Sequence, residues 1–256
     1  LPVDVERRER GHQVRILDLV KHRRRAAQAL EAQMREFQPD LVGISAMSFQ
    51  IGSARNTAAL CRAMKPDVIT ALGGYHATIM YEEIGEGPDR RLFDYVVRGE
   101  GEETFSSLGE ALDAQGDVAA IAGLSYRRGS QYVHNLPASL LDLGRVRPPD
   151  RRARVSSHFL WMGRPFDVAE TSRGCTMPCG FCSIRRMYGK TFRLYPDERV
   201  VADMHAIKAR GARGVLFVDD NITLDGPRLR DLCLRFEAER VNDLFIVMQA
   251  SVFPIA

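Results

Sequence analysis

The chain has 256 residues, 45% of them hydrophobic, which is enough for one large or two modest domains with packed cores. Its formal net charge is only +3, because 36 Lys and Arg residues nearly balance 33 Asp and Glu residues, and no nucleic-acid partner is expected. No apolar run is long enough to span a membrane, and the sequence lacks a signal-peptide core. We therefore expect a cytoplasmic protein.

The first half of the chain alternates strand patterns with helix patterns. Such alternation predicts parallel strands joined by crossover helices, with both faces of the sheet covered. The expected strands are 13–19, 41–46, 68–72 and 95–97, and the expected helices are 26–37, 51–64 and 102–114. A hairpin over 123–133, turning at 128–130, closes this first domain, to which we assign residues 1–138.

The second half repeats the alternation after a break. Residues 139–165 are rich in Pro and Arg and have no clean period, so they are predicted to be a linker. The second domain is expected over 166–256. Its predicted strands are 167–171, 215–218 and 244–250, and its predicted helices are 196–210 and 227–240. This succession fits the first half of a (β/α) barrel, whose sites lie at the carboxyl ends of the strands.

Both ends of the chain fall inside these patterns. The apolar strand that should open the first sheet is expected before Leu1, and the strand 244–250 is followed by only a few residues. We therefore expect the first strand of one domain and the second half of the barrel to lie outside this sequence.

Three cysteines in one glycine-flanked loop are the most informative feature. Cys175, Cys179 and Cys182 follow the spacing Cys-x3-Cys-x2-Cys. Electron-transfer clusters are closed by four thiolates, so three leave one iron free to take another ligand. Structural zinc usually needs a second ligand pair, and none follows here. We interpret the loop as an iron-sulfur site with one open corner, with a zinc site or three structural cysteines as the alternatives.

The remaining cysteines, Cys61 and Cys233, lie in helix patterns and are predicted to be small buried side chains. An odd total of five cysteines without a secretory signal argues against disulfides and for a reducing compartment.

The cysteine spacing, with Phe181 just before the third cysteine, resembles the signature of the radical S-adenosylmethionine (radical SAM) superfamily. The resemblance implies that Cys175, Cys179 and Cys182 hold a [4Fe-4S] cluster whose open iron chelates S-adenosylmethionine. It places Phe181 beside the adenine. It also implies an external low-potential electron donor, because the reduced cluster cleaves S-adenosylmethionine.

A pair of carboxylates, Asp219 and Asp220, follows the predicted strand 215–218 and would share an edge with the cysteine loop. Carboxylates there can accept hydrogen bonds from the ammonium group of S-adenosylmethionine. Many family members carry a Gly-Gly-Glu-like motif at this place, and the Asp pair resembles a variant of cobalamin-linked members. The resemblance thus assigns both residues to S-adenosylmethionine binding, and turn or helix-cap chemistry is the alternative.

Three segments of the first domain resemble motifs of cobalamin-binding Rossmann-like domains: 40–45, 72–78 and 94–102. They fall at strand carboxyl ends, where such folds bind ligands. Serine there can hydrogen-bond the nucleotide tail, and paired glycines let the backbone approach it. The residues assigned to cobalamin are Ser45, Gly73, Gly74, His76, Gly99 and Glu100. The loop that carries the lower cobalt ligand in some relatives would precede Leu1, which leaves that ligand undecided.

Together the resemblances predict an α/β protein: a Rossmann-like cobalamin-binding domain followed by the first half of a radical SAM barrel. The implied cofactors are the [4Fe-4S] cluster, S-adenosylmethionine and cobalamin. The implied function is methyl transfer to an unactivated carbon or phosphorus centre of an unidentified small molecule. The alternatives are a non-catalytic fragment that binds the cofactors, and a radical SAM enzyme without cobalamin.

Overall fold

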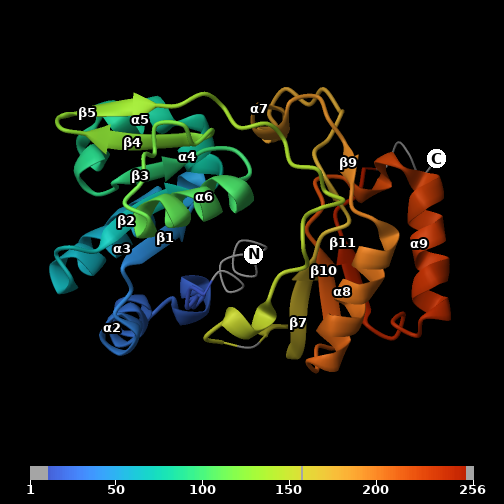
Figure 1. Cartoon of the computed structure of the whole chain (residues 1–256). Helices are drawn as coiled ribbons and strands as arrows, with labels where there is room; N and C mark the ends of the chain where they lie inside the picture. Colours follow the sequence, from blue (N-terminus) through green and yellow to red (C-terminus); the bar gives the residue numbers. More distant parts are fainter. Residues whose placement is uncertain (1–10, 157, 252–256) are drawn as a thin grey trace. The chain divides into compact units, whose positions relative to one another are not determined.

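The computed structural model describes residues 11–156 and 158–251, which divide into two compact units (Figure 1). Unit 1 comprises Leu1–Leu140 and Pro149–Val155, and unit 2 comprises Leu141–Pro148 and Ser156–Ala256. The segment predicted as a linker thus contributes residues to both units. Each unit combines helices with a sheet that contains parallel strands, which confirms the predicted α/β class.

Unit 1 is built on a five-stranded sheet of order β1-β2-β3-β4-β5. Its strands are β1 (Leu41–Ser45), β2 (Ile69–Gly73), β3 (Tyr95–Val97), β4 (Leu124–Arg128) and β5 (Gln131–His134). The first three strands are parallel, and β4 and β5 form the predicted antiparallel hairpin. In the register of β1 and β2, Ser45 pairs with Gly73, so the two strands end level with each other.

Helices cover both faces of this sheet. They are α2 (Ala26–Phe37), α3 (Ile51–Met64), α4 (Tyr75–Ile79), α5 (Tyr81–Glu86) and α6 (Gly101–Asp113), with 3-10 turns η1 (Leu19–His22), η2 (Ser48–Gln50), η3 (Pro88–Arg91) and η4 (Arg151–Ala153). Successive residues of β2 point to opposite faces. Ala71 therefore packs in the core that contains Leu108 of α6, whereas Leu72 packs in the core that contains Ala58 of α3.

One partly buried carboxyl group connects these layers. Asp94, just before β3, accepts hydrogen bonds from the Thr70 backbone N–H (2.9 Å), Arg62 of α3 (2.5 Å) and Arg127 of β4 (2.9 Å). Burial alone would raise the pKa of Asp94, but these hydrogen bonds outweigh it and hold the pKa below its usual value. The side chain thus fixes α3, β2 and β4 around the start of β3.

Residues 13–19 do not form the strand that their alternation predicts. Within them only Ile16 makes a β-bridge, to Arg154, and a 3-10 turn begins at Leu19. An extended segment needs hydrogen-bonded neighbours along its length. Leu17 instead lines a groove of about 770 Å³ whose other walls include Val42 of β1 and Leu30 of α2. The strand expected before Leu1 lies outside the described residues.

Unit 2 is built on a four-stranded sheet of order β11-β10-β7-β6. The strands are β6 (Phe159–Trp161), β7 (Arg164–Ala169), β10 (Gly214–Phe217) and β11 (Phe245–Met248), with a separate pair formed by β8 (Ser172–Arg173) and β9 (Arg193–Leu194). Strands β7, β10 and β11 are parallel and match the three predicted strands. Strand β6 was not predicted, because its three residues lie in the segment that has no clean period.

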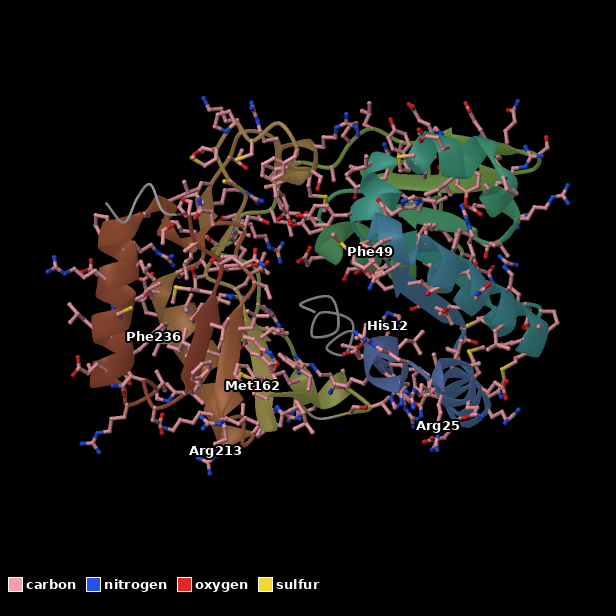
Figure 2. All side chains as sticks on the ribbon, turned by 180° about the vertical axis from the view of Figure 1, so that it is seen from behind. His12, Arg25, Phe49, Met162, Arg213 and Phe236 are labelled. Carbon is pink, nitrogen blue, oxygen red and sulfur yellow. The ribbon has the colours of Figure 1, made fainter. Side chains whose placement is uncertain are left out.

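The two long helices of unit 2, α8 (Asp197–Ala209) and α9 (Gly226–Ala238), pack on one face of this sheet, and shorter helical segments are α7 (Ile184–Tyr188) and η5 (Ile222–Leu224). The core between them contains Val215, Phe217, Met204 and Leu232, all at most 1% exposed. Phe236 of α9, labelled in Figure 2, stacks on Phe217 with ring centroids 6.0 Å apart.

The other face of the sheet carries a row of aromatic rings. Phe166 of β7 lies between Phe159 and Phe245, with ring centroids 5.9 and 6.0 Å away. Phe166 is only 2% exposed, and its neighbour in the register on β10 is Gly214. A Cβ atom on that glycine would lie 2.4 Å from the Phe166 ring, so the ring needs a glycine there.

We therefore expect Gly214→Ala to lower the free energy of unfolding by about 1–3 kcal/mol, because the added methyl overpacks the Phe166 ring. Urea denaturation measures this. In a Phe166→Leu background the smaller side chain leaves room, so Gly214→Ala should cost less there. If Gly214→Ala lowers the free energy of unfolding equally in both backgrounds, the close contact with the Phe166 ring is not the cause of the loss.

Candidate cofactor sites

The cysteine loop of unit 2 is closed at its base by two short strands. Ser172 pairs with Leu194 and Arg173 pairs with Arg193, so β8 and β9 hold the two ends of the loop together. Gly174 follows β8 with φ of +88°, and a Cβ atom there would lie 2.4 Å from the carbonyl oxygen of Thr191. Both observations require glycine before the first cysteine.

Within this loop the three cysteines are accessible and free of disulfides. Cys179 is exposed, and Cys175 and Cys182 are partly exposed. The backbone N–H of Cys182 donates to the carbonyl of Cys179 over 3.1 Å, which makes a tight turn between them. In residues 11–156 and 158–251 no three His, Cys, Asp or Glu side chains converge as metal ligands. Three free, accessible thiols in one loop are nevertheless a donor set that suits an iron-sulfur cluster.

The two other cysteines differ from each other. Cys61 is fully buried, as predicted. The prediction that Cys233 is buried is wrong, because it lies exposed on α9. On α9 the buried residues are Leu232 and Phe236, four residues apart, and Cys233 falls outside their narrow stripe.

Asp219 follows β10 and fastens the start of the cysteine loop. Its carboxyl group is 1% exposed and accepts the Thr171 backbone N–H (3.1 Å), the Thr171 hydroxyl (2.6 Å) and the Ser172 hydroxyl (2.5 Å). Arg228 of α9 in turn donates to the carbonyl oxygen of Thr171 over 3.3 Å. These bonds join the ends of β10 and β7.

Asp220 makes the next contact along the loop. Its Oδ2 atom accepts the backbone N–H of Gly174 over 2.8 Å, and the side chain is only partly buried. Burial raises the pKa of Asp220, the bond from Gly174 partly offsets this, and the neighbouring Asp219 raises it further. The adjacent carboxyl groups thus hold the loop at two successive points, and Asp220 is the more accessible of them.

Glu170, which sequence reasoning did not single out, forms a third contact at the end of β7, where its side chain is partly buried. It accepts the Tyr195 hydroxyl (2.9 Å) and Arg173 Nε (3.1 Å). Burial raises the pKa of Glu170, and the positive charge of Arg173 partly offsets this. Only the pairing of β8 with β9 brings Tyr195 to Glu170, so no local sequence signal could have identified the contact.

Phe181, predicted to lie beside the adenine, is 94% exposed in the cysteine loop. A large aromatic side chain so exposed has most of its surface available for a bound molecule.

In unit 1 the carboxyl ends of β1 and β2 form a continuous backbone ledge. The Ala46 N–H donates to Gly73 (3.1 Å), and the His76 N–H donates to Ala46 (3.2 Å). Gly74 has φ of +88°, and a Cβ atom on it would lie 2.9 Å from the Ala46 carbonyl oxygen and from Ser45 Oγ. Gly74 therefore lets the two strand ends approach closely, and Ser45 itself is exposed at this edge.

Thr78 connects this ledge to the end of β3. Its hydroxyl donates to the Gly74 carbonyl over 2.9 Å and accepts the Gly99 backbone N–H over 2.9 Å. Glu100, 6% exposed, precedes the first turn of α6. Thr78 lies in the segment 72–78 but was not among the residues predicted to bind cobalamin. Its position four residues after Gly74, at the end of a helix, was the available signal.

His76 also faces the loop after β1. Its Nδ1 atom lies 3.2 Å from the Ser48 hydroxyl. Burial, and then the positive charge of Arg55, lower the pKa of His76, so its imidazole is neutral at pH 7. The same loop carries Phe49, labelled in Figure 2, which is 85% exposed. All six residues assigned to cobalamin thus lie at or just after the carboxyl ends of β1, β2 and β3.

A family comparison bears directly on this ledge. The family described as B12 binding domain matches residues 7–109, a range that contains β1 to β3 and all six assigned residues. The chain carries a B12 binding domain.

Comparisons over the longer chain extend the likeness to unit 2. An uncharacterized methyltransferase of Pyrococcus horikoshii is 32% identical over 212 residues, which cover 82% of this chain and 46% of that protein. An anaerobic magnesium-protoporphyrin IX monomethyl ester cyclase of Rubrivivax gelatinosus is 27% identical over 215 residues, covering 79% of this chain and 38% of that protein. The chain therefore spans less than half the length of these two relatives.

A solved structure supports the fold. The radical S-adenosylmethionine methyltransferase TsrM from Kitasatospora setae aligns with a TM-score of 0.76 and 20% identity, covering 96% of this chain and 50% of that one. The resemblance to radical SAM proteins that contain a cobalamin-binding domain is confirmed. In the part of the chain that the structure describes, no helix is long and apolar enough to cross a membrane.

The contacts of Asp219 generate a prediction. Asp219→Ala removes the acceptor of three donors, so we expect the free energy of unfolding to fall by about 3 kcal/mol and the Thr171 amide to exchange hydrogen faster. Asp219→Asn should cost less, because the amide keeps one acceptor oxygen. Urea denaturation and hydrogen exchange measure both effects.

The matched control is Asp243→Asn, since Asp243 is exposed and pairs with Lys208 at the surface. Asp243→Asn should leave the free energy of unfolding and the hydrogen exchange of the Thr171 amide almost unchanged. If Asp219→Ala is as stable as the control and its Thr171 amide exchanges hydrogen at the unaltered rate, Asp219 does not hold the start of the cysteine loop in place.

Proposed function

We propose that this chain is the cofactor-binding part of a cobalamin-dependent radical SAM enzyme that transfers a methyl group to an unactivated carbon or phosphorus centre of a small molecule. One observation carries the proposal: a three-thiol loop fixed at the carboxyl end of β7 follows a B12 binding domain in the same chain. The methyltransferase names of two similar proteins support the reaction.

In this proposal Cys175, Cys179 and Cys182 hold a [4Fe-4S] cluster. When bound, the cluster and S-adenosylmethionine supply one-electron cleavage chemistry, and cobalamin supplies a methyl carrier. The loop's own residues orient the thiols. Gly174 lets the backbone turn tightly, and Asp219 keeps the start of the loop in place. The proposal includes a reducing, cytoplasmic location and an external low-potential electron donor for the cluster.

S-adenosylmethionine would bind beside this loop. We assign its adenine to Phe181, whose ring is exposed, and its ammonium group to Asp220, which is partly accessible. Asp219 belongs to the same binding site through its hold on Thr171 and Ser172, because its own oxygens already accept three donors. A carboxyl group near a bound ammonium makes a charge-assisted hydrogen bond.

Cobalamin would bind on the ledge of unit 1. Its nucleotide tail needs close backbone approach and hydrogen-bond donors, which Gly73, Gly74 and the Ser45 hydroxyl supply. His76, neutral at pH 7, is an imidazole donor or acceptor at the same edge. Gly99 and Glu100 complete the site from the end of β3.

A second reaction has its own support. The name of the similar cyclase from Rubrivivax gelatinosus supports ring formation as the alternative reaction. A methylated product favours the first candidate, and an oxidised, cyclised product favours the second. The further alternatives are a chain that binds the cofactors without turnover, and a radical enzyme whose unit 1 does not hold cobalamin.

The cluster assignment predicts a contrast between two cysteine variants. After anaerobic reconstitution, Cys179→Ala should lose the cluster and form no 5′-deoxyadenosine from S-adenosylmethionine, because one of three thiolates is gone. Cys233→Ala, the exposed cysteine on α9, should behave as the unaltered chain. Iron and sulfide per chain and chromatography of 5′-deoxyadenosine are the measurements.

Two outcomes are decisive here. A full cluster in Cys179→Ala would reject the ligand assignment. A full cluster in the unaltered chain without 5′-deoxyadenosine would favour the non-catalytic alternative.

The cobalamin assignment predicts a contrast between two glycine variants. Gly73→Ala places a methyl 3.9 Å from Val97, an ordinary contact, so the fold should be unchanged, whereas cobalamin retention should fall about tenfold because the ledge is narrowed. Gly52→Ala, in open space on α3, should leave both unchanged or slightly raise stability. Equilibrium dialysis with cobalamin absorbance measures retention. If the unaltered chain retains none while it binds the cluster, the assignment of unit 1 is wrong.

A further inference from the structure

Arg98, directly after β3, is a buried cation that the cofactor assignments above do not use. Its side chain is 8% exposed, and its Nε atom has no hydrogen-bond partner among the described residues. The guanidinium group lies over the ring of Tyr81 on α5, 4.6 Å from the ring centroid. Burying a polar group that is not fully hydrogen-bonded is unfavourable. We therefore asked which part of unit 1 this side chain holds in place.

The hydrogen bonds of Arg98 run from the end of β3 to the hairpin formed by β4 and β5 (Figure 1). Its Nη2 atom donates to the carbonyl oxygen of Leu124 over 3.3 Å and to the carbonyl oxygen of Asn135. Leu124 is the first residue of β4, and Asn135 directly follows β5. One guanidinium group thus joins both ends of the hairpin to the residue that precedes Gly99.

The backbone makes a second connection at the same place. The Arg98 N–H donates to the carbonyl oxygen of Gly123 over 2.8 Å. Gly123 has φ of +77°, and a Cβ atom on it would lie 3.1 Å from the Arg98 carbonyl oxygen and 2.9 Å from Thr104 Oγ1. Thr104 of α6 in turn donates to the carbonyl oxygen of Ala122 over 2.9 Å. This close packing leaves the Arg98 backbone little room to shift.

The turn that follows Arg98 is the one assigned to cobalamin. Gly99 has φ of +74°, and its N–H donates to the Thr78 hydroxyl, which itself donates to the carbonyl oxygen of Gly74 on the ledge. Glu100 comes next and opens α6. The turn therefore has two supports, Thr78 on the side of the ledge and Arg98 on the side of the hairpin. Without Arg98 it is held on one side only.

The support from the hairpin lies outside the part of the chain that matches the B12 binding domain. That match ends at residue 109, whereas the three residues whose carbonyl groups Arg98 binds come later in the chain: Gly123, Leu124 and Asn135. The β4–β5 hairpin is thus an addition to the matched range that reaches back to the end of β3.

We propose that Arg98 is a positioning residue, which fixes the turn of Gly99 and Glu100 against the β4–β5 hairpin and so sets the preference of unit 1 for corrinoids that carry a nucleotide tail. This inference rests on the proposed function, in which the ledge binds that tail. The turn is bonded through Thr78 to Gly74, one of the two glycines assigned to the tail. A corrinoid without a tail does not need this arrangement, so its binding does not depend on Arg98.

The test compares two corrinoids on the full chain. The probes are hydroxocobalamin and diaquacobinamide, which lacks the nucleotide and its phosphate, and equilibrium dialysis with corrinoid absorbance gives each Kd. Arg98→Met keeps an unbranched chain but removes the donors, so the Kd for cobalamin should rise about tenfold, as expected for lost hydrogen bonds from a charged group. The Kd for cobinamide should change less than about twofold, because no contact with a tail is lost.

A conservative variant keeps the test informative if Arg98→Met does not fold. Arg98→Lys retains a buried cation that can still donate to one of the two carbonyl groups, but it loses the planar fork. Its Kd for cobalamin should rise about threefold with cobinamide unchanged.

The matched control is Arg62→Met, at the opposite end of β3. Arg62 donates to Asp94 and to the carbonyl oxygen of Leu92 over 3.1 Å, so this variant also loses bonds from a partly buried guanidinium group. It should lower the free energy of unfolding and leave the ratio of the two Kd values unchanged. Arg128→Met, exposed at the hairpin turn, should change neither quantity. An equal change of the ratio in Arg62→Met would make general destabilisation the cause and overturn the proposal.

Hydrogen exchange gives a readout that does not require a corrinoid. The Gly99 amide should exchange faster in Arg98→Met than in Arg62→Met, because only the first variant loosens this turn. An unchanged Gly99 rate, an unchanged Kd for cobalamin, or an equal rise of both Kd values in Arg98→Met overturns the proposal. If the unaltered chain binds neither corrinoid, the cobalamin assignment fails and the tail preference with it, whereas the exchange rate of Gly99 still decides whether Arg98 holds the turn.

Discussion

The carboxyl group of Asp219 is the constraint on which the geometry of unit 2 depends most. A buried carboxyl group is costly unless hydrogen bonds satisfy it. Here the donors are Thr171 and Ser172, which belong to the end of β7 and the start of β8. Satisfying Asp219 therefore fixes where the cysteine loop leaves the sheet. The pairing of β8 with β9 and the close contact of Gly174 with Thr191 then close that loop.

In unit 1 the polar groups at the strand ends are satisfied by backbone and hydroxyl groups rather than by a carboxyl group. Parallel strands that end level with each other leave their last N–H and C=O groups in need of partners. Ala46, Gly73 and His76 satisfy one another along the ends of β1 and β2. Thr78 carries the connection on to Gly99 at the end of β3. The result is a backbone ledge with small side chains, which large flat ligands can approach, and it coincides with the B12 binding domain match.

The basic residues of the cysteine loop fall into a buried group and an exposed group. Arginines that are buried, such as Arg173, hold elements together through Glu170. Exposed cations of the same loop contribute little to folding, because surface charges are screened by water and salt. The loop thus has a structural side and an outward side.

How far the sequence predicts the fold depends on whether a pattern is local. Helices 26–37 and 51–64 and strand 95–97 were predicted to the residue, because apolar periodicity and breakers such as Pro39 act within one element. The segment 13–19 has strand periodicity but no strand, since ladder bonds depend on a neighbour that the pattern does not contain. Strand β6 was missed for the converse reason: its aromatic residues pack on Phe166, far from any local signal.

The sequence by itself predicted the chemistry proposed for this protein: three thiols at a spacing that suits a cluster with one open iron, and a glycine motif upstream of them. These are properties of residue type and short-range order. Only the tertiary structure decided which carboxyl group is buried and which is accessible, that Cys233 faces water, and that Glu170, Tyr195 and Thr78 take part. Those facts depend on which strands end side by side, and burial and hydrogen bonding across elements are settled only when the chain packs.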